Sequence, residues 1–336
     1  MITILETSAL NTVQDLGRPG YRNLGVGTSG VMDPLALRVG NILLGNRDDD
    51  AGIELQTYPF ALRLDAATSF VVTGIDAVIE LDGRAILPWM VTTAAAGQVL
   101  RVGPPAKGAR GYICVAGGID VPVVLGSRST QLRGGFGGLD GRPLEAGDTL
   151  EITGAPLDVS GYGALPPTKV LDAVAGQEDG RLIHLRAMTA TDYGLFTPEA
   201  QERLWNTHWR ITPQSNRVGY RLAGEPLELR HPVELRSYGV IAGIVQVPPA
   251  GEPIVQLADA NTVGGYPRIA TVIEADLWRL AQARIGTRIQ LHECSFEQGV
   301  AAMRPVDTYL DGLRTMVAHY RASARRRTGV KSGDKA

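Results

Sequence analysis

The segment Phe60–Gly83, FALRLDAATSFVVTGIDAVIELDG, indicates the fold class of this chain. It contains three short runs rich in β-branched and apolar residues, 60–64, 70–73 and 78–81, which are separated by small and acidic residues. Such runs between turn signals are typical of short β-strands. The dipeptide Asp82-Gly83 follows the third run directly and favours a type I′ turn, so a tight hairpin is expected there.

The same pattern continues outward from this segment. Further strand-like runs occupy residues 99–102, 112–116 and 150–152, and another begins the second half of the chain at 182–185. The chain contains 41 glycines and 20 prolines, which interrupt it at short intervals. Many short strands joined by tight turns are typical of sandwiches and barrels, not of a doubly wound α/β sheet. The sequence therefore predicts a mainly β fold.

Few helices are predicted. Asp33 is a suitable N-cap, Pro34 fits the first helical position, and Gly45 can end that helix. Thr197-Pro198 begins a second helix that continues to Trp205, and a third is predicted over residues 271–283.

The C-terminal region is predicted to be helical from residue 296 to 325. Ser295 and Gln298 have the spacing of a capping box at its start. An apolar stripe supports the helix, and it consists of Val306, Leu310, Leu313, Val317 and Tyr320.

The segment 161–180 is rich in proline, glycine and charge, and it is the predicted linker between two β-rich subdomains. We expect an N-terminal subdomain over residues 1–160 and a C-terminal subdomain over 181–295. A helical extension that ends in a basic tail is expected over 296–336.

Composition excludes several functional classes. The chain has 336 residues and a formal net charge of −2, so no global basic field is available to bind nucleic acid or an anionic membrane. No apolar run approaches the roughly 20 residues that a transmembrane helix needs, and the first residues lack the basic region of a signal peptide. The two cysteines and five histidines show no metal-ligand spacing. We therefore expect a reduced, metal-free, cytoplasmic protein.

The sequence supports neither a dinucleotide-binding site nor a biotin attachment site. Gly25, Gly27 and Gly30 match G-x-G-x-x-G, but a turn-rich loop precedes them where a dinucleotide site needs a buried strand. None of the six methionines precedes a lysine, as the Met-Lys-Met core of a biotin attachment site requires. Any biotin must therefore arrive on another chain.

Three glycine-rich regions gather polar side chains, and they are 12–20 with 29–33, 215–222, and 243–249 with 259–267. Glycine allows a backbone to approach a ligand closely. Carboxamides can bind both ends of a planar N–C=O group, arginine can hold a carboxylate or a developing oxyanion, and a buried aspartate can act as a general base. The predicted catalytic residues are Asp15, Asp33 and Asp259. The predicted substrate-binding residues are Gln14, Arg18, Ser29, Arg217, Gln246, Asn261, Gly264, Gly265 and Tyr266. No metal ligand is predicted.

Each of these assignments has a structural alternative. Asp33 can serve only as a helix N-cap, and Asp15 with Arg18 can form an ion pair that holds an N-terminal loop. The Gly264-Gly265 dipeptide can be a turn. Gln246 can satisfy backbone groups, and Tyr266 can pack without contacting a ligand.

The same regions resemble the allophanate hydrolase subunit 2 family. Its members are mostly described as the C subunit of 5-oxoprolinase or as biotin-dependent carboxyltransferase, and they are similar to the C-terminal part of the urea carboxylase carboxyltransferase domain. The resemblance covers about residues 10–292. The matching strings are Val13–Arg18, Ser29–Asp33, Asn41–Asn46, Ala116–Ile119, Leu125–Thr130, Gly147-Asp148, Gln246–Pro248, Asp259 and Thr262–Pro267, with Asp276 and Gln282 beyond them.

This resemblance implies a cyclophilin-like β-barrel architecture and a partner, the homologue of the B subunit. With a homologue of the A subunit, such a complex opens the lactam of 5-oxoproline to glutamate and uses ATP at the level of the complex. One alternative is the subunit of a biotin-dependent carboxyltransferase that acts on urea or a related amide, with biotin on another chain. A further alternative is a regulatory partner of a B subunit that resembles a kinase inhibitor.

The chain departs from the family pattern at several positions. Asn216 stands where an aspartate is usual, and Asn261 where a glutamine is usual. Met188-Thr189 replaces the usual Gly-Pro. The loss of a carboxylate at 216 removes one candidate base or arginine partner, and the shorter side chain at 261 reduces its reach by about one methylene.

Overall fold

The computed structural model describes residues 1–175 and 182–329, and the chain forms two compact units. Unit 1 contains Met1–Leu16, Pro34–Val170 and the chain from Asp307 onward. Unit 2 contains Gly17–Asp33 and the described part of Leu171–Val306. Residues 176–180 of the predicted linker, residue 181 at the start of the predicted C-terminal subdomain, and residues 330–336 of the predicted tail lie outside the described residues. The predicted subdomain limits remain a prediction.

Unit 1 contains two antiparallel sheets around one apolar core. The first sheet has the order β11 (Ile119–Asp120), β12 (Thr149–Ile152), β1 (Ile2–Glu6), β4 (Phe60–Leu64), β9 (Val99–Lys107), β6 (Asp76–Leu81) and β7 (Arg84–Ile86). The second has the order β2 (Thr12–Gln14), β3 (Gly52–Leu55), β10 (Gly111–Val115), β5 (Thr68–Thr73) and β8 (Thr92–Ala94). Apolar side chains of both sheets, such as Phe60 and Phe70, meet in the core because alternate residues of a strand point to one face.

The predicted hairpin at Asp82-Gly83 is confirmed. Leu81 pairs with Arg84, and the two turn residues have φ of 48° and 74°. Positive φ at both central positions is the geometry of a type I′ turn, which matches the twist of the flanking strands.

Unit 2 contains a closed barrel of seven strands. Its order is β13 (Leu182–Thr189), β20 (Arg268–Val272), β17 (Ile244–Gln246), β18 (Ile254–Gln256), β15 (Gly219–Ala223), β14 (Trp209–Ile211) and β21 (Arg288–Glu293). The parallel pair β13–β21 closes the ring. Fully buried side chains including Trp209, Val245 and Val255 fill its interior. The prediction of a mainly β fold with a barrel is confirmed.

A two-stranded ribbon of β16 (Tyr238–Gly239) and β19 (Val263–Gly264) also belongs to unit 2. Its two strands pair Tyr238 with Gly264 and Gly239 with Val263.

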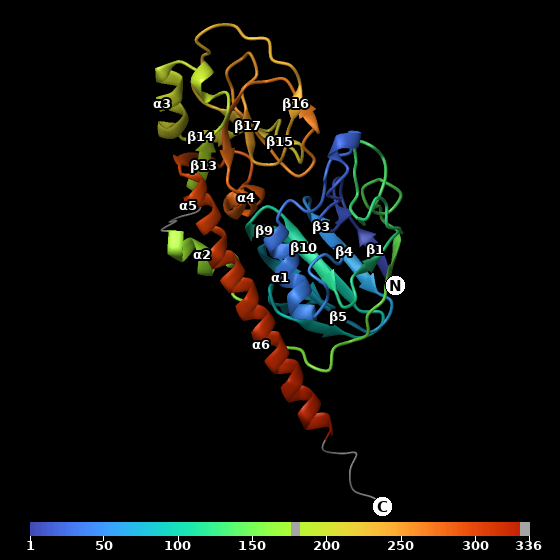
Figure 1. Cartoon of the computed structure of the whole chain (residues 1–336). Helices are drawn as coiled ribbons and strands as arrows, with labels where there is room; N and C mark the ends of the chain where they lie inside the picture. The colour runs from blue at the N-terminus through green and yellow to red at the C-terminus, as the bar shows by residue number, and fades with distance from the viewer. Residues whose placement is uncertain (176–181, 330–336) are drawn as a thin grey trace, which may run out of the picture. The chain divides into compact units, whose positions relative to one another are not determined.

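Helices are few among the described residues (Figure 1). They are α1 (Pro34–Leu44), α2 (Pro167–Ala175), α3 (Pro198–Asn206), α4 (Glu274–Ala281), α5 (Phe296–Ala301) and α6 (Met303–Gly329), with 3₁₀ turns at Arg22–Leu24 and Tyr193–Leu195.

The predicted start of α3 is confirmed, since the Thr197 hydroxyl accepts from the Ala200 N–H. The predicted helix at residue 271 was wrong at its start. Thr271 and Val272 are β-branched and belong to β20, where they pair with residues of β13. The helix therefore begins at Glu274.

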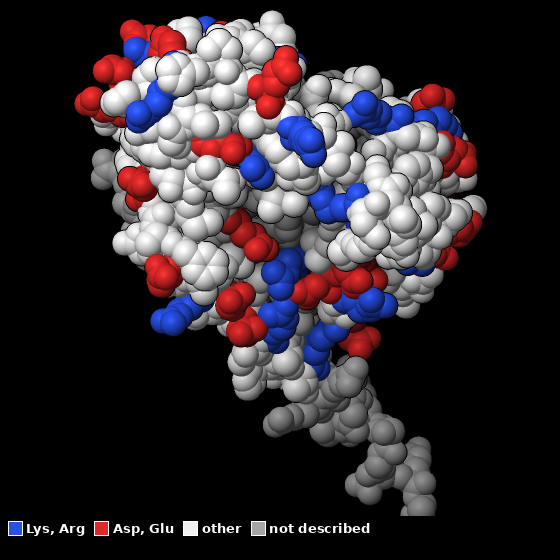
Figure 2. All heavy atoms as spheres, turned by 45° about the horizontal axis from the view of Figure 1, so that its top comes forward, with Lys and Arg blue, Asp and Glu red and all other residues white. Residues whose placement is uncertain are grey.

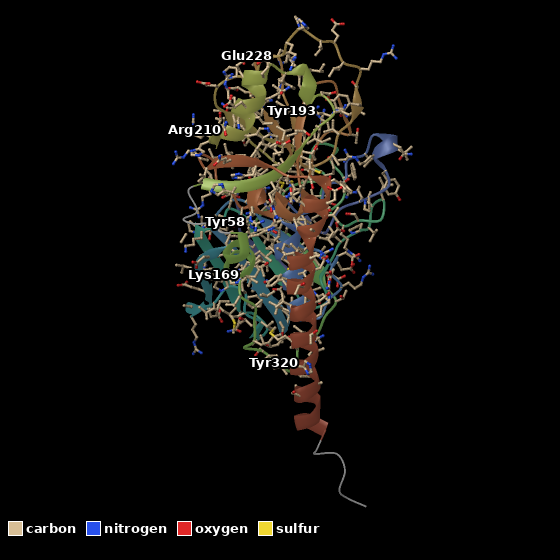
Figure 3. All side chains as sticks on the ribbon, turned by 60° about the vertical axis from the view of Figure 1, so that its left-hand side comes forward. Tyr58, Lys169, Tyr193, Arg210, Glu228 and Tyr320 are labelled. Atoms are coloured by element: carbon tan, nitrogen blue, oxygen red, sulfur yellow. The ribbon has the colours of Figure 1, made fainter. Side chains whose placement is uncertain are left out.

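The C-terminal helical region is confirmed. Ser295 and Gln298 form the capping box, and α6 continues to Gly329. The stripe residues Leu310, Leu313 and Val317 are buried. Tyr320, labelled in Figure 3, instead stacks on Tyr162 with ring centroids 5.2 Å apart.

No described helix is both long and apolar enough to cross a membrane. On the face shown in Figure 2, lysine and arginine side chains are interspersed with aspartate and glutamate.

A histidine pair on the barrel predicts a pH effect. His184 Nδ1 and His292 Nε2 lie 2.7 Å apart on β13 and β21. Partial burial and then the neighbouring His184 lower the pKa of His292 from its usual 6.5. The folded state therefore prefers the neutral ring, and unit 2 should lose stability as the pH falls below about 6.5.

Urea unfolding between pH 5 and 8 should show this loss of stability, and His292→Gln should reduce it. The control is His208→Gln, at a histidine of unit 2 outside this pair, and this variant should retain the loss of stability; an equal effect of both variants would contradict the assignment.

Candidate functional site

The structure places the predicted site residues in two groups. Gln14 and Asp15 lie in unit 1 at the end of β2. The others lie in unit 2, and they are Arg18, Ser29, Asp33, Arg217, Gln246, Asp259, Asn261, Gly264, Gly265 and Tyr266. Each group is described within its own unit.

Asp15 is held by the loop that follows β11. Its Oδ1 accepts from the hydroxyls of Ser127 and Ser129, both at 2.6 Å, and its Oδ2 accepts from the Arg128 N–H at 2.5 Å. The Asp15 N–H donates to the Ser129 hydroxyl at 2.9 Å. A buried carboxylate with three donors is strongly anchored. The geometry favours a role for Asp15 in shaping the loop over a role as a mobile base.

Gln14 is fully buried. Its Nε2 donates to the Thr12 hydroxyl at 3.0 Å and to the Thr130 carbonyl at 3.1 Å. Its Oε1 has no hydrogen-bond partner among the described residues. A buried acceptor without a partner is costly and therefore indicates a site where a ligand or an ordered water can bind.

In unit 2, Arg217 and Asp259 form a buried ion pair. Arg217 precedes β15 and Asp259 follows β18, and these strands are neighbours in the barrel. The Arg217 Nε lies 2.8 Å from Oδ2 and the Nη2 lies 3.2 Å from Oδ1, while the Asp259 N–H donates to the Arg217 carbonyl at 3.0 Å. Only 5% and 9% of the two side chains are exposed. The planar guanidinium matches the carboxylate fork, so the pair is geometrically well defined.

Arg217 also donates from Nη2 to the Gly30 carbonyl. The ion pair therefore ties the loop 27–30 to the loop that carries Asp259. Gly27 supports the same contact, since a Cβ there would lie 3.4 Å from the Ala260 carbonyl oxygen.

Asn216, one of the departures from the family pattern, has a local role. Its Oδ1 accepts from the Val218 N–H at 2.8 Å, which closes a turn before β15. The carboxylate partner of Arg217 is Asp259, so the ion pair does not depend on an acid at 216.

Ser29 combines strain with burial. Its φ of 53° lies in the left-handed region, which is unfavourable for a residue with a Cβ. Its side chain is buried, and its Oγ has no hydrogen-bond partner among the described residues. Strained residues and buried polar atoms of this kind concentrate at functional sites. Ser29 precedes Gly30, which Arg217 holds, so its position is well defined.

Arg18 and Asp33 are also buried in unit 2. The Arg18 N–H donates to the Thr28 carbonyl at 2.8 Å, and Asp33 Oδ2 accepts from Gln282 Nε2 at 2.8 Å. Gln282, one of the family matches, caps α4 and so orients Asp33.

A row of polar side chains crosses the outer face of the barrel at β20, β17 and β18. Gln246 pairs with Arg268 across the first two strands. Gln256 Nε2 donates to Gln246 Oε1 at 3.0 Å. Both glutamines are buried, with 5% and 6% of their surface exposed.

The ribbon β16–β19 contacts this row. Arg268 lies over the Tyr238 ring at 3.6 Å and donates from Nε to Asp192 at 2.9 Å. Burial raises the pKa of the Tyr238 hydroxyl, and this hydroxyl accepts from Gln246 Nε2 at 3.5 Å. A Cβ on Gly264 would lie 2.7 Å from Gln246 Nε2, so a side chain there would push the Gln246 amide out of this position. The other loop residues of the predicted site are more exposed, with Tyr266 at 46%.

The sequence interpretation missed Gln256, Tyr238, Arg268 and Asp192. One signal was available, because β17 and β18 have the same sequence, Ile-Val-Gln. A polar residue at the same place in two short apolar strands indicates that both side chains leave the barrel interior.

A separate cavity of about 230 Å³ lies in unit 1. It is lined by Arg47, Asp50, Ala51, Gly117, Gly118, Ile119, Asp120, Arg128 and Thr153. Arg128 pairs there with Asp120 at 2.8 Å, and Arg47 with Asp49 at 2.9 Å. None of the residues that line this cavity is among the predicted site residues.

The chain is similar to several known proteins over most of its length. The C subunit of 5-oxoprolinase from Haemophilus influenzae is 39% identical over 317 residues, covering 94% of this chain and 99% of that protein. The C subunit of 5-oxoprolinase from Escherichia coli is 38% identical, covering 93% and 97%. The crystal structure of the K. lactis urea amidolyase has a TM-score of 0.84 at 28% identity, covering 93% of this chain and 20% of that chain.

The predicted resemblance to the C subunit of 5-oxoprolinase and to urea carboxylase proteins is therefore confirmed. The family model for the carboxyltransferase domain, subdomain A and B, matches residues 24–293. The match includes the barrel, the ribbon β16–β19 and the Arg217–Asp259 pair. The chain belongs to the family of carboxyltransferase domains, subdomain A and B.

Proposed function

We propose that this chain is the C subunit of an ATP-dependent 5-oxoprolinase-type complex, which opens the lactam of 5-oxoproline to glutamate with homologues of the A and B subunits. One observation carries the proposal. The chain is 38–39% identical to two C subunits of 5-oxoprolinase over 97–99% of their length, and it is only 30–31% identical to the urea amidolyases that it resembles. Sequence identity therefore favours the C subunit of 5-oxoprolinase over the urea amidolyases.

The polar groups of unit 2 suit a planar N–C=O substrate. The Gln246 carboxamide can bind the lactam edge, and the Ser29 hydroxyl is a further group of unit 2 that can donate or accept a hydrogen bond. The Arg217–Asp259 pair holds the loop that carries Ser29. We assign ATP to the complex as a whole, as the resemblance to the C subunits of 5-oxoprolinase implies.

The test is co-expression of this chain with its A and B partner homologues, followed by an assay of ATP-dependent glutamate release from 5-oxoproline. Turnover that Gln246→Ala lowers at least tenfold, in a complex that still assembles, would support the proposal. No turnover by a well-folded complex would refute it.

Ser29→Gly provides a sharper variant. Glycine adopts positive φ without the steric cost of a Cβ, so the change should raise the free energy of unfolding by about 1 kcal/mol. Loss of the hydroxyl should at the same time lower kcat/KM about tenfold. Both quantities can be measured by urea unfolding and the glutamate assay.

The control for this variant is Asp140→Gly. Asp140 has a φ of 54° and is exposed, so the same relief of strain is expected with unchanged kcat/KM. Equal activity of Ser29→Gly and the wild type would exclude Ser29 from the site.

A second candidate function is biotin-dependent carboxyl transfer to urea or a related amide. The TM-score of 0.84 with a urea amidolyase and the carboxyltransferase family match favour it. Biotin would be carried on another chain. Urea-dependent consumption of carboxybiotin by the assembled proteins, without glutamate release from 5-oxoproline, would support this candidate over the first. Tight binding of the B partner without either reaction would instead support a regulatory role.

A further inference from the structure

We propose that Gln256 is a positioning residue, which holds the Gln246 carboxamide with its NH₂ group toward the substrate carbonyl oxygen. The pair would then make the site selective for rings that carry a carbonyl. This inference rests on the proposed function and assigns a role to a residue outside the predicted site.

The first step is the orientation of Gln246. An amide can turn by 180° about its last side-chain bond, which exchanges a donor for an acceptor. Gln256 Nε2 lies 3.0 Å from Gln246 Oε1. The other end of the Gln246 amide lies 3.5 Å from the Tyr266 carbonyl oxygen, which can only accept. A turned amide would place NH₂ against NH₂ and oxygen against oxygen, so the contacts select one orientation.

The second step is the availability of the NH₂ group. Its contacts with the Tyr266 carbonyl and the Tyr238 hydroxyl are both 3.5 Å long. Hydrogen bonds of this type are strongest near 2.9 Å, so these two are weak. A carbonyl oxygen of a ligand can therefore replace them at a small cost. Gly264 packs closely against this nitrogen, since a Cβ there would lie 2.7 Å from it, so the glycine backbone can approach the amide.

The third step is rigidity. Gln246 and Gln256 end neighbouring strands of a closed barrel, so their backbones are fixed. Both side chains are buried, which excludes water as a competing partner. A donor held in place before binding contributes more to selectivity than one that must be ordered on binding.

The experiment uses the complex assembled with the A and B partner homologues and the variant Gln256→Glu. The introduced carboxylate can only accept when ionised, so it should turn the Gln246 amide and present oxygen to the substrate carbonyl. We expect KM for 5-oxoproline to rise about tenfold. The inhibition constant of L-proline, which has the same ring and carboxylate without the carbonyl, should stay within twofold.

Gln256→Met keeps the approximate size of the side chain without the hydrogen bond, and it tests the inference if the buried carboxylate prevents folding. It should raise KM for 5-oxoproline several-fold and again leave inhibition by proline unchanged. The control is Gln290→Glu on β21, where Nε2 donates to the Trp205 carbonyl at 3.3 Å. This control should leave both constants unchanged.

A general loss of structure would raise both constants together, so a selective rise for 5-oxoproline supports the positioning role. Unchanged KM in a folded Gln256→Glu or Gln256→Met complex would overturn the inference while leaving the proposed function intact. A wild-type complex that neither binds nor cleaves 5-oxoproline would overturn both.

Discussion

Replacement of Arg217 with methionine is expected to lower the free energy of unfolding of unit 2 by about 3–5 kcal/mol. The variant would leave the Asp259 carboxylate, 9% exposed, without its buried cation. It would also remove the donor to the Gly30 carbonyl and so release the loop that carries Ser29. Urea unfolding followed by tryptophan fluorescence can measure this loss, since Trp209 lies in the barrel core. Activity of the complex should fall with it.

The control for this result is Arg47→Met. Arg47 pairs with Asp49 at 2.9 Å, but 79% of the Arg47 side chain is exposed. Exposed pairs contribute about 0–1 kcal/mol, because water screens them. The double variant Arg217→Met with Asp259→Leu should recover part of the stability, since it removes both charges. A loss below about 1 kcal/mol for Arg217→Met alone would show that the pair is not structurally important.

Asp15→Asn is expected to lower the free energy of unfolding of unit 1 by about 3 kcal/mol. In one orientation the asparagine NH₂ would face the Arg128 N–H, which can only donate. In the other it would face the hydroxyls of Ser127 and Ser129, which would lose the carboxylate oxygen that now accepts from both. Hydrogen bonds to a charged group are worth about 1.5–3 kcal/mol each, and a buried donor left without an acceptor adds to the loss. Thermal unfolding and hydrogen exchange of the 125–130 loop can measure the change.

Asp120→Asn is the matched control for Asp15→Asn. Arg128 contacts both acids, since its backbone N–H donates to Asp15 and its guanidinium lies 2.8 Å from the Asp120 carboxylate. The Asp120 side chain is 48% exposed. We expect a change of about 1 kcal/mol or less. Equal effects of the two variants would mean that Asp15 does not anchor the loop.

Local chemistry made much of the fold predictable. The Asp82-Gly83 hairpin depends on two adjacent residues that tolerate positive φ, and the capping box depends on Ser295 and Gln298 three positions apart. Such features need only neighbours in the chain. The helix predicted at Thr271 shows the limit, because pairing with β13 and β17 holds Thr271 in a strand. Long-range pairing overrode a local pattern.

The candidate site was predictable in its residue types but not in its contacts. Polar side chains among glycines identified Asp15, Ser29, Arg217, Gln246 and Asp259 from the sequence alone. The pairing of Arg217 with Asp259 joins residues 42 positions apart, because β15 and β18 are neighbours in the barrel. The sequence pattern did not contain that strand order.

The sequence by itself determined the strand-rich character, the hairpin, the helix caps, the family resemblance and the set of candidate polar residues. Only the tertiary structure decided that Gln256 donates to Gln246, that Ser127 and Ser129 donate to Asp15, and that the Ser29 side chain is buried on a backbone with positive φ. The physical reason is the range of the interactions. Turns and caps are satisfied within a few residues, whereas burial and side-chain hydrogen bonds depend on which distant strands become neighbours when the barrel closes.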